Sequence, residues 1–353
     1  MPSVDDLILA GDIGGRTVQI VSSGDVECTQ YEPRALADGE VRIQTVTSAV
    51  SPGTEMTYYG RNATNVYLNK TWNPALRLFE RGASASSYPV TFGYRAAGRV
   101  VETKHPDVAL STRIYGSWRH TEFVTMPGGR AQLQFLPDDL SWDDGVDIAH
   151  MGPICVNAVA FGDGGQRGQP VVVFGAGPVG LIVAQILKAK GASRVYVVDR
   201  LESRLGIARG LGLDTLIADD DGAARELKGL HGSEAFPVVW ECTGSTAALH
   251  DAIRVVRRQG AVIAVGFYQG DARNLYLGEE FHHNGVRIVS GQIGNIHPTM
   301  DMASLRVETL ELVRRGDLVL GRLPRLAIAV EDVAQGFRSL SRPSAVLQVA
   351  LTY

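Results

Sequence analysis

Three glycines followed by an acid form the pattern in this sequence that most clearly points to chemistry. Gly175, Gly177 and Gly180 stand between an apolar run at 171–174, typical of a buried strand, and a stretch at 181–189 with helical apolar spacing. In a dinucleotide-binding unit the first glycine allows a tight turn, the second lets the backbone approach a pyrophosphate, and the third lets helix and strand pack closely. The N–H groups at the helix N-terminus then bind phosphate. The residues of this turn predicted to bind the cofactor are Gly175, Gly177, Pro178, Val179 and Gly180.

Asp199 indicates which dinucleotide would bind. It ends a second predicted strand, 194–198, and lies 19 residues after Gly180, close to the roughly 20 expected for a carboxylate that binds ribose hydroxyls. A carboxylate there repels a 2′-phosphate, which favours NAD over NADP. Arg200 and Arg204 argue against this choice, because an arginine just after the strand can hold a 2′-phosphate. We expect both arginines to face solvent or to stack on adenine.

The composition excludes several function classes. The net charge is −4, from 34 basic and 38 acidic residues, and no basic tract suggests nucleic-acid binding. The first residues are acidic where a signal peptide is basic, and glycines interrupt the longest apolar run, 171–184. We therefore expect a cytoplasmic protein without a membrane segment. Three widely spaced cysteines favour neither a disulfide framework nor a zinc cluster.

The elements that position these residues fall into two architectures. Residues 7–44 alternate apolar and polar side chains between glycine turns, as short antiparallel strands do, whereas strand and helix patterns alternate from 171 to 290. The second region has six predicted strands, which complete a doubly wound sheet. Because a last strand at 346–351 is expected to return to the first architecture, the nucleotide domain is predicted to be an insertion.

The order of these parts resembles the medium-chain dehydrogenase/reductases over essentially the whole chain. The matching stretches are 51–55 (Ser-Pro-Gly-Thr-Glu), 92–98 (Phe-Gly-Tyr-Arg-Ala-Ala-Gly), 120–124, 175–180, 199–205 and 241–244. The resemblance implies an α/β protein with a GroES-like, β-rich catalytic domain (1–155 and 297–353) and a Rossmann NAD-binding domain with a doubly wound parallel sheet (156–296). It also implies a cleft between the domains and a homodimer.

The sequence departs from the family at the zinc ligands. The resemblance puts Ser51 or Pro52, Tyr94, Arg95 and Gly152 at positions that carry ligands to catalytic zinc in other members. None of these side chains is a good zinc ligand, and the four-cysteine lobe for structural zinc is missing, so we predict no zinc. In these respects the chain is similar to a zinc-lacking branch that includes bacteriochlorophyllide hydroxyethyl dehydrogenases and cyclitol or sugar dehydrogenases, often biosynthetic enzymes.

Without a metal, a side chain must exchange the hydroxyl proton during hydride transfer. Tyr94 is the first candidate, since Arg95 beside it could lower the phenol pKa. The alternative is that Tyr94 fills the former metal cavity while Arg95 pairs with Glu55. His120 is the second candidate, because the resemblance puts its strand end near the cleft, although a histidine with satisfied hydrogen bonds in the core is more common. His150 could serve in a relay.

Further side chains are expected around the substrate and the nicotinamide. Thr54 and Asn157 are candidate hydrogen-bond donors. The turn Val265, Gly266 and Phe267 follows a buried parallel strand and should line the nicotinamide. The family match at 241–244 adds Cys242 and Thr243 to the predicted cofactor site. His282 and His283, if on a strand, would point to opposite faces and could not share a metal.

The segment 56–89 suggests the type of substrate. It would overhang the cleft in the family geometry, and its phenol, amide and guanidinium groups suit a hydroxyl-rich molecule such as a cyclitol, an amino sugar or a glycoside. The polar and aromatic residues in question are Tyr58, Tyr59, Arg61, Asn62, Asn65, Tyr67, Asn69 and Trp72. An ordinary solvated surface or a subunit contact is the alternative.

The sequence thus predicts a metal-independent, NAD-dependent oxidoreductase that interconverts a secondary alcohol and a ketone on a small polar substrate. One alternative is an NADPH-dependent reductase of quinone or enone double bonds, against which Asp199 argues. Another is a dinucleotide-binding sensor or scaffold that has lost catalysis, which the loss of the zinc ligands would fit.

Overall fold

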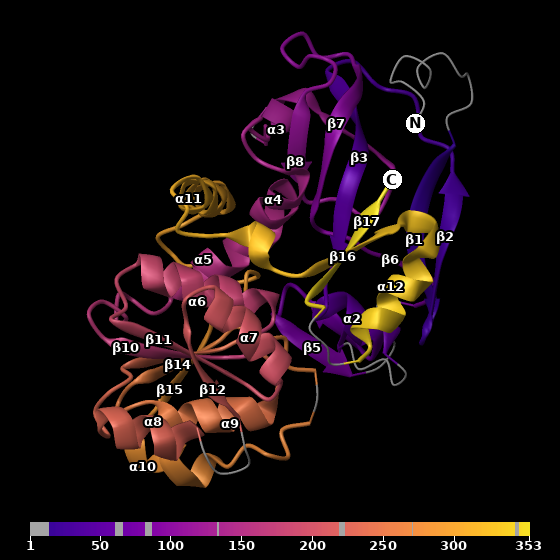
Figure 1. The fold of residues 1–353 in the computed structure, drawn as a ribbon. Coiled ribbons are helices and arrows are strands. Elements are labelled where there is room, and N and C mark those ends of the chain that lie inside the picture. The colour runs from indigo at the N-terminus through magenta and orange to yellow at the C-terminus, as the bar shows by residue number, and fades with distance from the viewer. Residues whose placement is uncertain are drawn as a thin grey trace. The chain divides into compact units, whose positions relative to one another are not determined.

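The chain forms two compact units in the computed structural model, which describes residues 14–60, 66–81, 87–132, 134–218, 223–269, 271–342 and 346–353 (Figure 1). The first unit comprises Met1–His150, Arg325–Arg342 and Gln348–Tyr353. The second comprises Met151–Pro324 and Pro343–Leu347. The second unit is therefore inserted in the sequence of the first. This agrees with the expectation that a last strand, at 346–351, returns to the first architecture.

The first unit is built mainly on antiparallel strands, and only β16 and β17 pair in parallel among its described strands. A six-stranded sheet has the order β16-β17-β3-β7-β8, with β9 also paired to β3, and a three-stranded sheet has the order β2-β1-β6. The strands are β1 (Gly15–Ser22), β2 (Asp25–Tyr31), β3 (Glu40–Val50), β6 (Val90–Thr91), β7 (Ala96–Thr103), β8 (Arg113–Gly116), β9 (Phe123–Pro127), β16 (Arg325–Ala329) and β17 (Gln348–Thr352). The C-terminal β17 pairs with β3, which fixes the end of the chain in this unit.

Short helices complete the first unit. They are α2 (Thr54–Tyr59), α3 (Gly128–Gln132), α4 (Trp142–Val146) and α12 (Val333–Leu340), with a π-helical turn at Asp147–Met151. Val333 and Phe337 of α12, one turn apart, are buried in a cluster with Val18 and Ile20 of β1. The segment 56–89 contains most of α2 and a hairpin of β4 (Lys70–Asn73) and β5 (Leu78–Arg81).

The second unit is a doubly wound α/β domain, as predicted. Six parallel strands have the order β12-β11-β10-β13-β14-β15. They are β10 (Pro170–Phe174), β11 (Arg194–Asp199), β12 (Asp214–Ile217), β13 (Val238–Glu241), β14 (Ala261–Ala264) and β15 (Arg287–Ser290). In Figure 1, α5 (Gly152–Ala160), α6 (Pro178–Ala189) and α7 (Glu202–Gly210) lie on one face of the sheet, with α8 (Ala223–His231) and α9 (Thr246–Val255) on the other.

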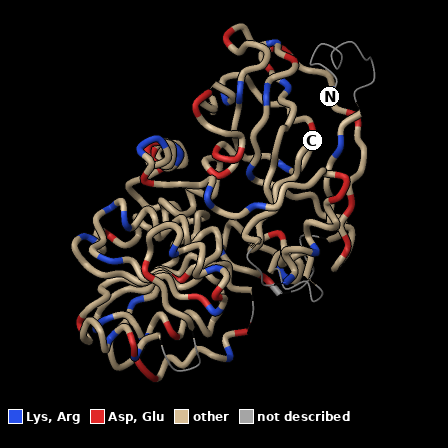
Figure 2. The backbone as a smooth tube through the Cα atoms, viewed as in Figure 1, with Lys and Arg blue, Asp and Glu red and all other residues tan. Residues whose placement is uncertain are grey.

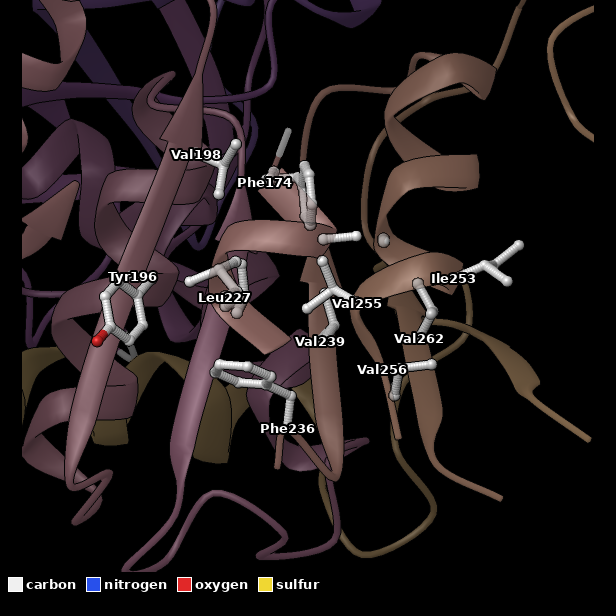
Figure 3. Packing of buried hydrophobic residues seen from close by; sticks show 14 of the residues in the cluster. Phe174, Tyr196, Val198, Leu227, Phe236, Val239, Ile253, Val255, Val256 and Val262 are labelled. Carbon is white, nitrogen blue, oxygen red and sulfur yellow. The ribbon is translucent and has the colours of Figure 1, made fainter. Parts of the chain in front are cut away.

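Buried branched side chains hold this sheet to its helices. Because both faces of a parallel sheet are covered, its central strands are continuous apolar runs, such as the fully buried Val171, Val172 and Val173. Figure 3 shows residues of one buried cluster, which includes Val239 and Val262 of the sheet and Ile253 of α9.

The structure differs from the sequence analysis at two places. Helix α11 (Met302–Arg314) belongs to the second unit, not to the catalytic domain, because it packs closely on α5: a side chain at Gly152 would overlap Thr309. The predicted boundaries at 155 and 297 therefore shift to 150 and 325. His282 and His283 lie in the short helix α10 (His282–Asn284), which Gly285 ends in the left-handed conformation, and not on a strand.

The charged residues show no segregation by sign along the described chain. Figure 2 shows Lys and Arg interspersed with Asp and Glu over both units, which agrees with the near-balanced composition. Among the described helices, none is long and apolar enough to cross a membrane.

Candidate active site

The glycine turn after β10 has the backbone geometry that its sequence predicts. Gly175 has φ of +100°, a region that favours glycine, and a Cβ there would lie 2.8 Å from Thr243 Cγ2. A Cβ at Gly180 would overlap the Gly175 carbonyl oxygen, so the first turn of α6 packs directly on the loop. At Gly177 a Cβ would meet nothing within 4 Å. Packing therefore requires glycine at 175 and 180 but not at 177.

Asp199 is held in place by this turn. Its Oδ2 accepts a hydrogen bond from the Ala176 N–H (2.7 Å), and its Oδ1 accepts one from the Leu201 N–H (2.9 Å). The carboxylate at the end of β11 is thus fixed beside the glycine turn at the end of β10. Each oxygen keeps a further lone pair with which to accept a hydrogen bond.

A cavity of about 610 Å³ opens in the second unit next to Asp199. Of the residues predicted to bind the cofactor, Asp199, Arg200, Arg204 and Thr243 line it. The lining residues that the sequence did not suggest include Ser245, Ala247, Ala248, His250, Asp251, Asn274 and Tyr276. They come from α9 and from the segment after β14, and no motif marked either stretch.

The turn after β13 is organised by a buried carboxylate. Glu241 accepts hydrogen bonds from the N–H groups of Thr243 (2.7 Å) and Gly244 (3.1 Å) and from the hydroxyls of Thr243 and Tyr268. Burial raises the pKa of Glu241, and these hydrogen bonds oppose the rise. Burial likewise raises the pKa of Cys242 well above its usual value, so this cysteine is a neutral thiol beside the glycine turn.

The turn Val265–Phe267 is fixed from both sides. The N–H groups of Val265 and Gly266 donate to the Glu241 carbonyl (2.8 and 3.1 Å), while the Gln292 amide donates to the carbonyls of Val265 and Gly266 (2.7 Å each). A side chain at Gly266 would overlap the Gly244 backbone, so the turns after β13 and β14 lie in contact. The sequence did not point to Gln292, which carries no motif.

Asn157 does not have the environment expected of a donor to substrate or nicotinamide. It is fully buried in α5, its Oδ1 accepts from the His297 N–H (2.8 Å), and its Nδ2 lies 3.3 Å from the Asn295 carbonyl. The side chain therefore anchors the segment 291–297, and its position does not support the predicted contact.

In the first unit, Tyr94 lies beside Ser51 and Thr54 at the start of α2. The Thr54 N–H donates to Ser51 Oγ (3.1 Å), and the Tyr94 ring packs against His150 with centroids 4.7 Å apart. Burial raises the Tyr94 pKa; the charge of Arg95 and hydrogen bonds with the side chains of Ser51 and Thr54 lower it by less. The expected depression of this pKa is therefore wrong, since burial outweighs the guanidinium.

Arg95 is a buried structural residue and does not pair with Glu55. Its guanidinium donates to Asp147 Oδ1 (2.7 Å), to Gln348 Oε1 (2.7 Å) and to the Val50 carbonyl (2.9 Å). Asp147 also accepts from Arg325 (2.6 Å). These contacts tie β7 to β3, β17 and the π-helical turn, so the alternative in which Arg95 pairs with Glu55 is also wrong.

His120 and Glu55 form a buried pair. His120 Nε2 lies 2.9 Å from Glu55 Oε2, and Nδ1 lies 2.8 Å from Ser48 Oγ, which in turn lies 3.2 Å from the Tyr353 hydroxyl. His120 is fully buried, which corrects the expectation that it faces a cleft and exchanges a proton directly. Glu55 Oε1 is buried without a hydrogen-bond partner among the described residues. Glu55 is close enough to Tyr94 for its charge to raise the phenol pKa.

The segment 56–89 is less polar at its surface than expected. Its hairpin exposes the large apolar side chains of Trp72, Leu76, Leu78 and Phe79, and the short helical turn Val66–Leu68 before it exposes Tyr67. Tyr58 and Tyr59 are instead buried, because α2 packs into the core of the first unit. Arg61, Asn62 and Asn65 lie outside the described residues.

Comparisons with known proteins show what this sequence and this fold are similar to. Residues 178–305 match the family model described as zinc-binding dehydrogenase. The 2R,3R-butanediol dehydrogenase of Bacillus subtilis has the same fold, with a TM-score of 0.75 over 96% of this chain and 99% of that one, at 19% identity. In this matched segment and in its fold, the chain is similar to the medium-chain dehydrogenase/reductases, a class of oxidoreductases.

Among individual relatives, the D-guloside 3-dehydrogenase of Shigella flexneri is 29% identical, over 74% of this chain and 76% of the relative. Two structures of the same fold contain a nicotinamide cofactor. An alcohol dehydrogenase of Escherichia coli CFT073 is complexed with NADH (TM-score 0.74, 16% identity, 97% of this chain and 100% of that one). A Sinorhizobium meliloti 1021 protein of the zinc-binding dehydrogenase type is bound to NADP (TM-score 0.72, 17% identity, 97% and 100%).

The match of residues 178–305 to the family model gives no evidence on whether this chain binds zinc. The matched range contains none of the positions that the resemblance assigns to zinc ligands, which are Ser51 or Pro52, Tyr94, Arg95 and Gly152. Within the described residues, one group of side chains could hold a metal, His250 with Glu279 and Glu280, and it shares no residue with those positions.

Proposed function

We propose that the protein is a metal-independent, NAD-dependent oxidoreductase that interconverts a secondary alcohol and a ketone on a polar substrate such as a cyclitol, an amino sugar or a glycoside. The observation that carries the proposal is the Asp199 carboxylate, fixed on the Ala176 N–H beside the glycine turn and lining a 610 Å³ cavity. A rigid acceptor next to a phosphate-type turn suits a ribose joined to a pyrophosphate.

The residues of the second unit fit a dinucleotide. The start of α6 offers N–H groups to phosphate, and Gly177 has room on its outer side for a close approach. Asp199 can accept from ribose hydroxyls and disfavours a 2′-phosphate, which supports NAD. NAD supplies the acceptor for the hydride when it is bound. The turn Val265–Phe267, held by Glu241 and Gln292, presents a fixed backbone surface for the nicotinamide.

The residues of the first unit can supply the proton that the carbonyl oxygen needs during ketone reduction. Because burial raises the Tyr94 pKa, the phenol stays protonated at neutral pH and can donate a hydrogen bond to a carbonyl oxygen. In ketone reduction the phenol is positioned as the general acid, with Ser51 and Thr54 orienting its oxygen. His120 fixes Glu55, whose second oxygen is available for hydrogen bonding, so we assign His120 a positioning role.

The residues at the family's zinc positions do not fit zinc. Tyr94 is a neutral phenol, Arg95 is a cation engaged by Asp147, and Gly152 has no side chain. No step of the proposed mechanism uses a metal.

The polarity of the substrate is inferred from the relatives and from the hydroxyl and carboxylate groups near Tyr94. The relative from Shigella flexneri is named for oxidation of a guloside. The relevant assay follows NADH formation by the metal-analysed protein with a panel of cyclitols, amino sugars and glycosides. NAD-linked turnover of one of these classes supports the proposal; turnover only of apolar alcohols contradicts the assignment of the substrate.

One observation favours a second candidate. Arg200 and Arg204 both line the cavity, and guanidinium groups could hold a 2′-phosphate. An NADPH-dependent reductase of quinones or enones would therefore use the same cavity. Consumption of NADPH with a quinone, without oxidation of polyols by NAD, would favour that function; binding of NADH without any turnover would favour a sensor.

A further inference from the structure

The segment 271–281 is attached along one side of helix α9. Three residues of α9, spaced at i, i+4 and i+8, form a single stripe on the helix and contact this segment. The contacts are Thr246 Oγ1 to the Asp271 carbonyl (3.3 Å), His250 Nε2 to Glu279 Oε2 (3.5 Å) and Arg254 Nε to Glu280 Oε1 (3.6 Å). The segment is thus held at both ends and bridges the cavity side of α9.

Two apolar side chains fix the same segment to the core. Leu275 and Phe281 are partly buried against the hydrophobic cluster that includes Leu249 and Ile253 of α9. Tyr276, which follows Leu275 directly, is instead 52% exposed and lines the cavity. A large aromatic residue that faces the cavity from an anchored segment needs an explanation other than core packing.

The Tyr276 ring has a fixed neighbour. It meets the His250 ring edge to face, with centroids 5.2 Å apart and an interplanar angle of 80°. Because His250 is itself held by Glu279, the two rings form a braced aromatic wall. Asp199 lines the same cavity from the end of β11. The cavity therefore combines a carboxylate that accepts from a diol with a flat aromatic surface, which are the groups that recognise a nucleoside.

We propose that Tyr276 is a cofactor-binding residue that stacks on the base of the bound dinucleotide, in a wall braced by the α9 stripe. This inference rests on the proposed function, because it requires an adenosine nucleotide in the cavity beside Asp199. It goes beyond that function in assigning recognition of the base to a segment that carries no nucleotide-binding motif.

The test measures equilibrium binding of NADH by fluorescence, and of AMP by competition with NADH, because AMP contains only the adenosine half. Alanine at Tyr276 removes a stacking surface, so Tyr276→Ala should weaken both ligands by roughly 5–100-fold. Tyr276→Phe keeps the ring and should bind both within about threefold of the wild type, since stacking needs only the ring face. Leu277→Ala is the matched control, because Leu277 is the next residue, is 47% exposed and does not line the cavity.

The possible outcomes distinguish the inference about Tyr276 from the proposed function. Loss of AMP affinity in Tyr276→Ala, with rescue in Tyr276→Phe and no change in Leu277→Ala, supports the inference. AMP binding by Tyr276→Ala that equals the wild type overturns the inference and leaves the proposed function intact. A wild-type protein that binds neither NADH nor AMP overturns both.

Discussion

At the scale of single residues, burial decides the chemistry of the candidate proton donor. Arg95 does lower the pKa of Tyr94, but burial of the phenol raises it by more. The raised pKa therefore favours a neutral hydrogen-bond donor over a phenolate base. His120 is fully buried, and Ser48 and Glu55 engage its two ring nitrogens.

Replacing Tyr94 by phenylalanine should remove the acid and keep the ring that packs on His150. We expect kcat to fall by roughly 10²–10⁴-fold, the contribution typical of a general acid, with the Kd for NADH unchanged. Steady-state kinetics of ketone reduction would measure this. Because the raised pKa keeps the phenol protonated across neutral pH, Tyr94 should add no titration to the wild-type rate profile between about pH 6 and 9. Full activity in the variant would refute the assignment of Tyr94 as the acid.

Arg95 should matter for stability instead of chemistry. Arg95→Met leaves the buried Asp147 with Arg325 as its remaining cationic partner, and breaking a buried pair costs about 3–5 kcal/mol. Urea unfolding would show this loss as a lower midpoint. Arg273→Met, at a side chain that is 85% exposed, should change the free energy of unfolding by less than about 0.5 kcal/mol. Equal effects of the two substitutions would show that the Arg95 network does not stabilise the fold.

At the scale of elements, two glycines of the turn after β10 are expected to have different roles, Gly180 in packing and Gly177 in cofactor binding. Gly180→Ala would push a Cβ into the Gly175 carbonyl, so both stability and NADH binding should fall. Gly177→Ala meets no protein atom within 4 Å and should keep the thermal midpoint within a few degrees. It should nevertheless weaken NADH binding at least tenfold if the pyrophosphate approaches the backbone there. Melting curves and NADH titrations on both variants test the pair. Unchanged NADH affinity in Gly177→Ala would place the pyrophosphate elsewhere.

The sequence predicted elements well where one signal repeats along the chain. The strand pattern with its glycine turn located β10, α6, β11 and Asp199, because fully buried strands are continuous apolar runs and their turns need glycine. Segments without such periodicity were misjudged. His282 and His283, which the sequence assigned to no helix, lie in a short helix. The hairpin in the segment 56–89 exposes Leu76, Leu78 and Phe79, which are not among the polar and aromatic residues expected there.

Long-range contacts account for the residues of the site that the sequence did not reveal. Gln292 reaches the carbonyls of Val265 and Gly266, and Tyr276 reaches the cavity through an anchored segment, but neither carries a local signal. Arg95 pairs with Asp147, which is 52 residues away in the chain. Only the fold brings such partners together, so sequence spacing could not choose between Glu55 and Asp147.

At the scale of the whole molecule, a doubly wound unit is inserted in the sequence of a β-rich unit, and the chain has the fold of the medium-chain dehydrogenase/reductases that it resembles. The matched family is described by zinc, yet the side chains at its ligand positions here are those of Ser51 or Pro52, Tyr94, Arg95 and Gly152. The change at several positions together supports the proposal that a side chain, not a metal, polarises the oxygen.

Removal of divalent metals should therefore leave the enzyme intact. After dialysis against a chelator, we expect unchanged NAD-linked activity and an unchanged thermal midpoint, since the proposed proton donor is Tyr94 and no step uses zinc. Elemental analysis before and after dialysis is the control. Stoichiometric zinc whose removal abolishes activity would refute the metal-free mechanism.

The homodimer implied by the family resemblance remains a prediction for the intact chain. Sedimentation equilibrium should give twice the mass of 37.9 kDa. A concentration-independent monomer would contradict it.

The most direct measurement of the central claim is a titration of the wild-type protein with NADH and with NADPH, followed by energy transfer from its four tryptophans. Asp199, fixed on the glycine turn, should disfavour the 2′-phosphate, so we predict NADH binding at least tenfold tighter than NADPH binding. Equal or tighter binding of NADPH would show that Arg200 and Arg204 outweigh Asp199 and would contradict an NAD-dependent dehydrogenase.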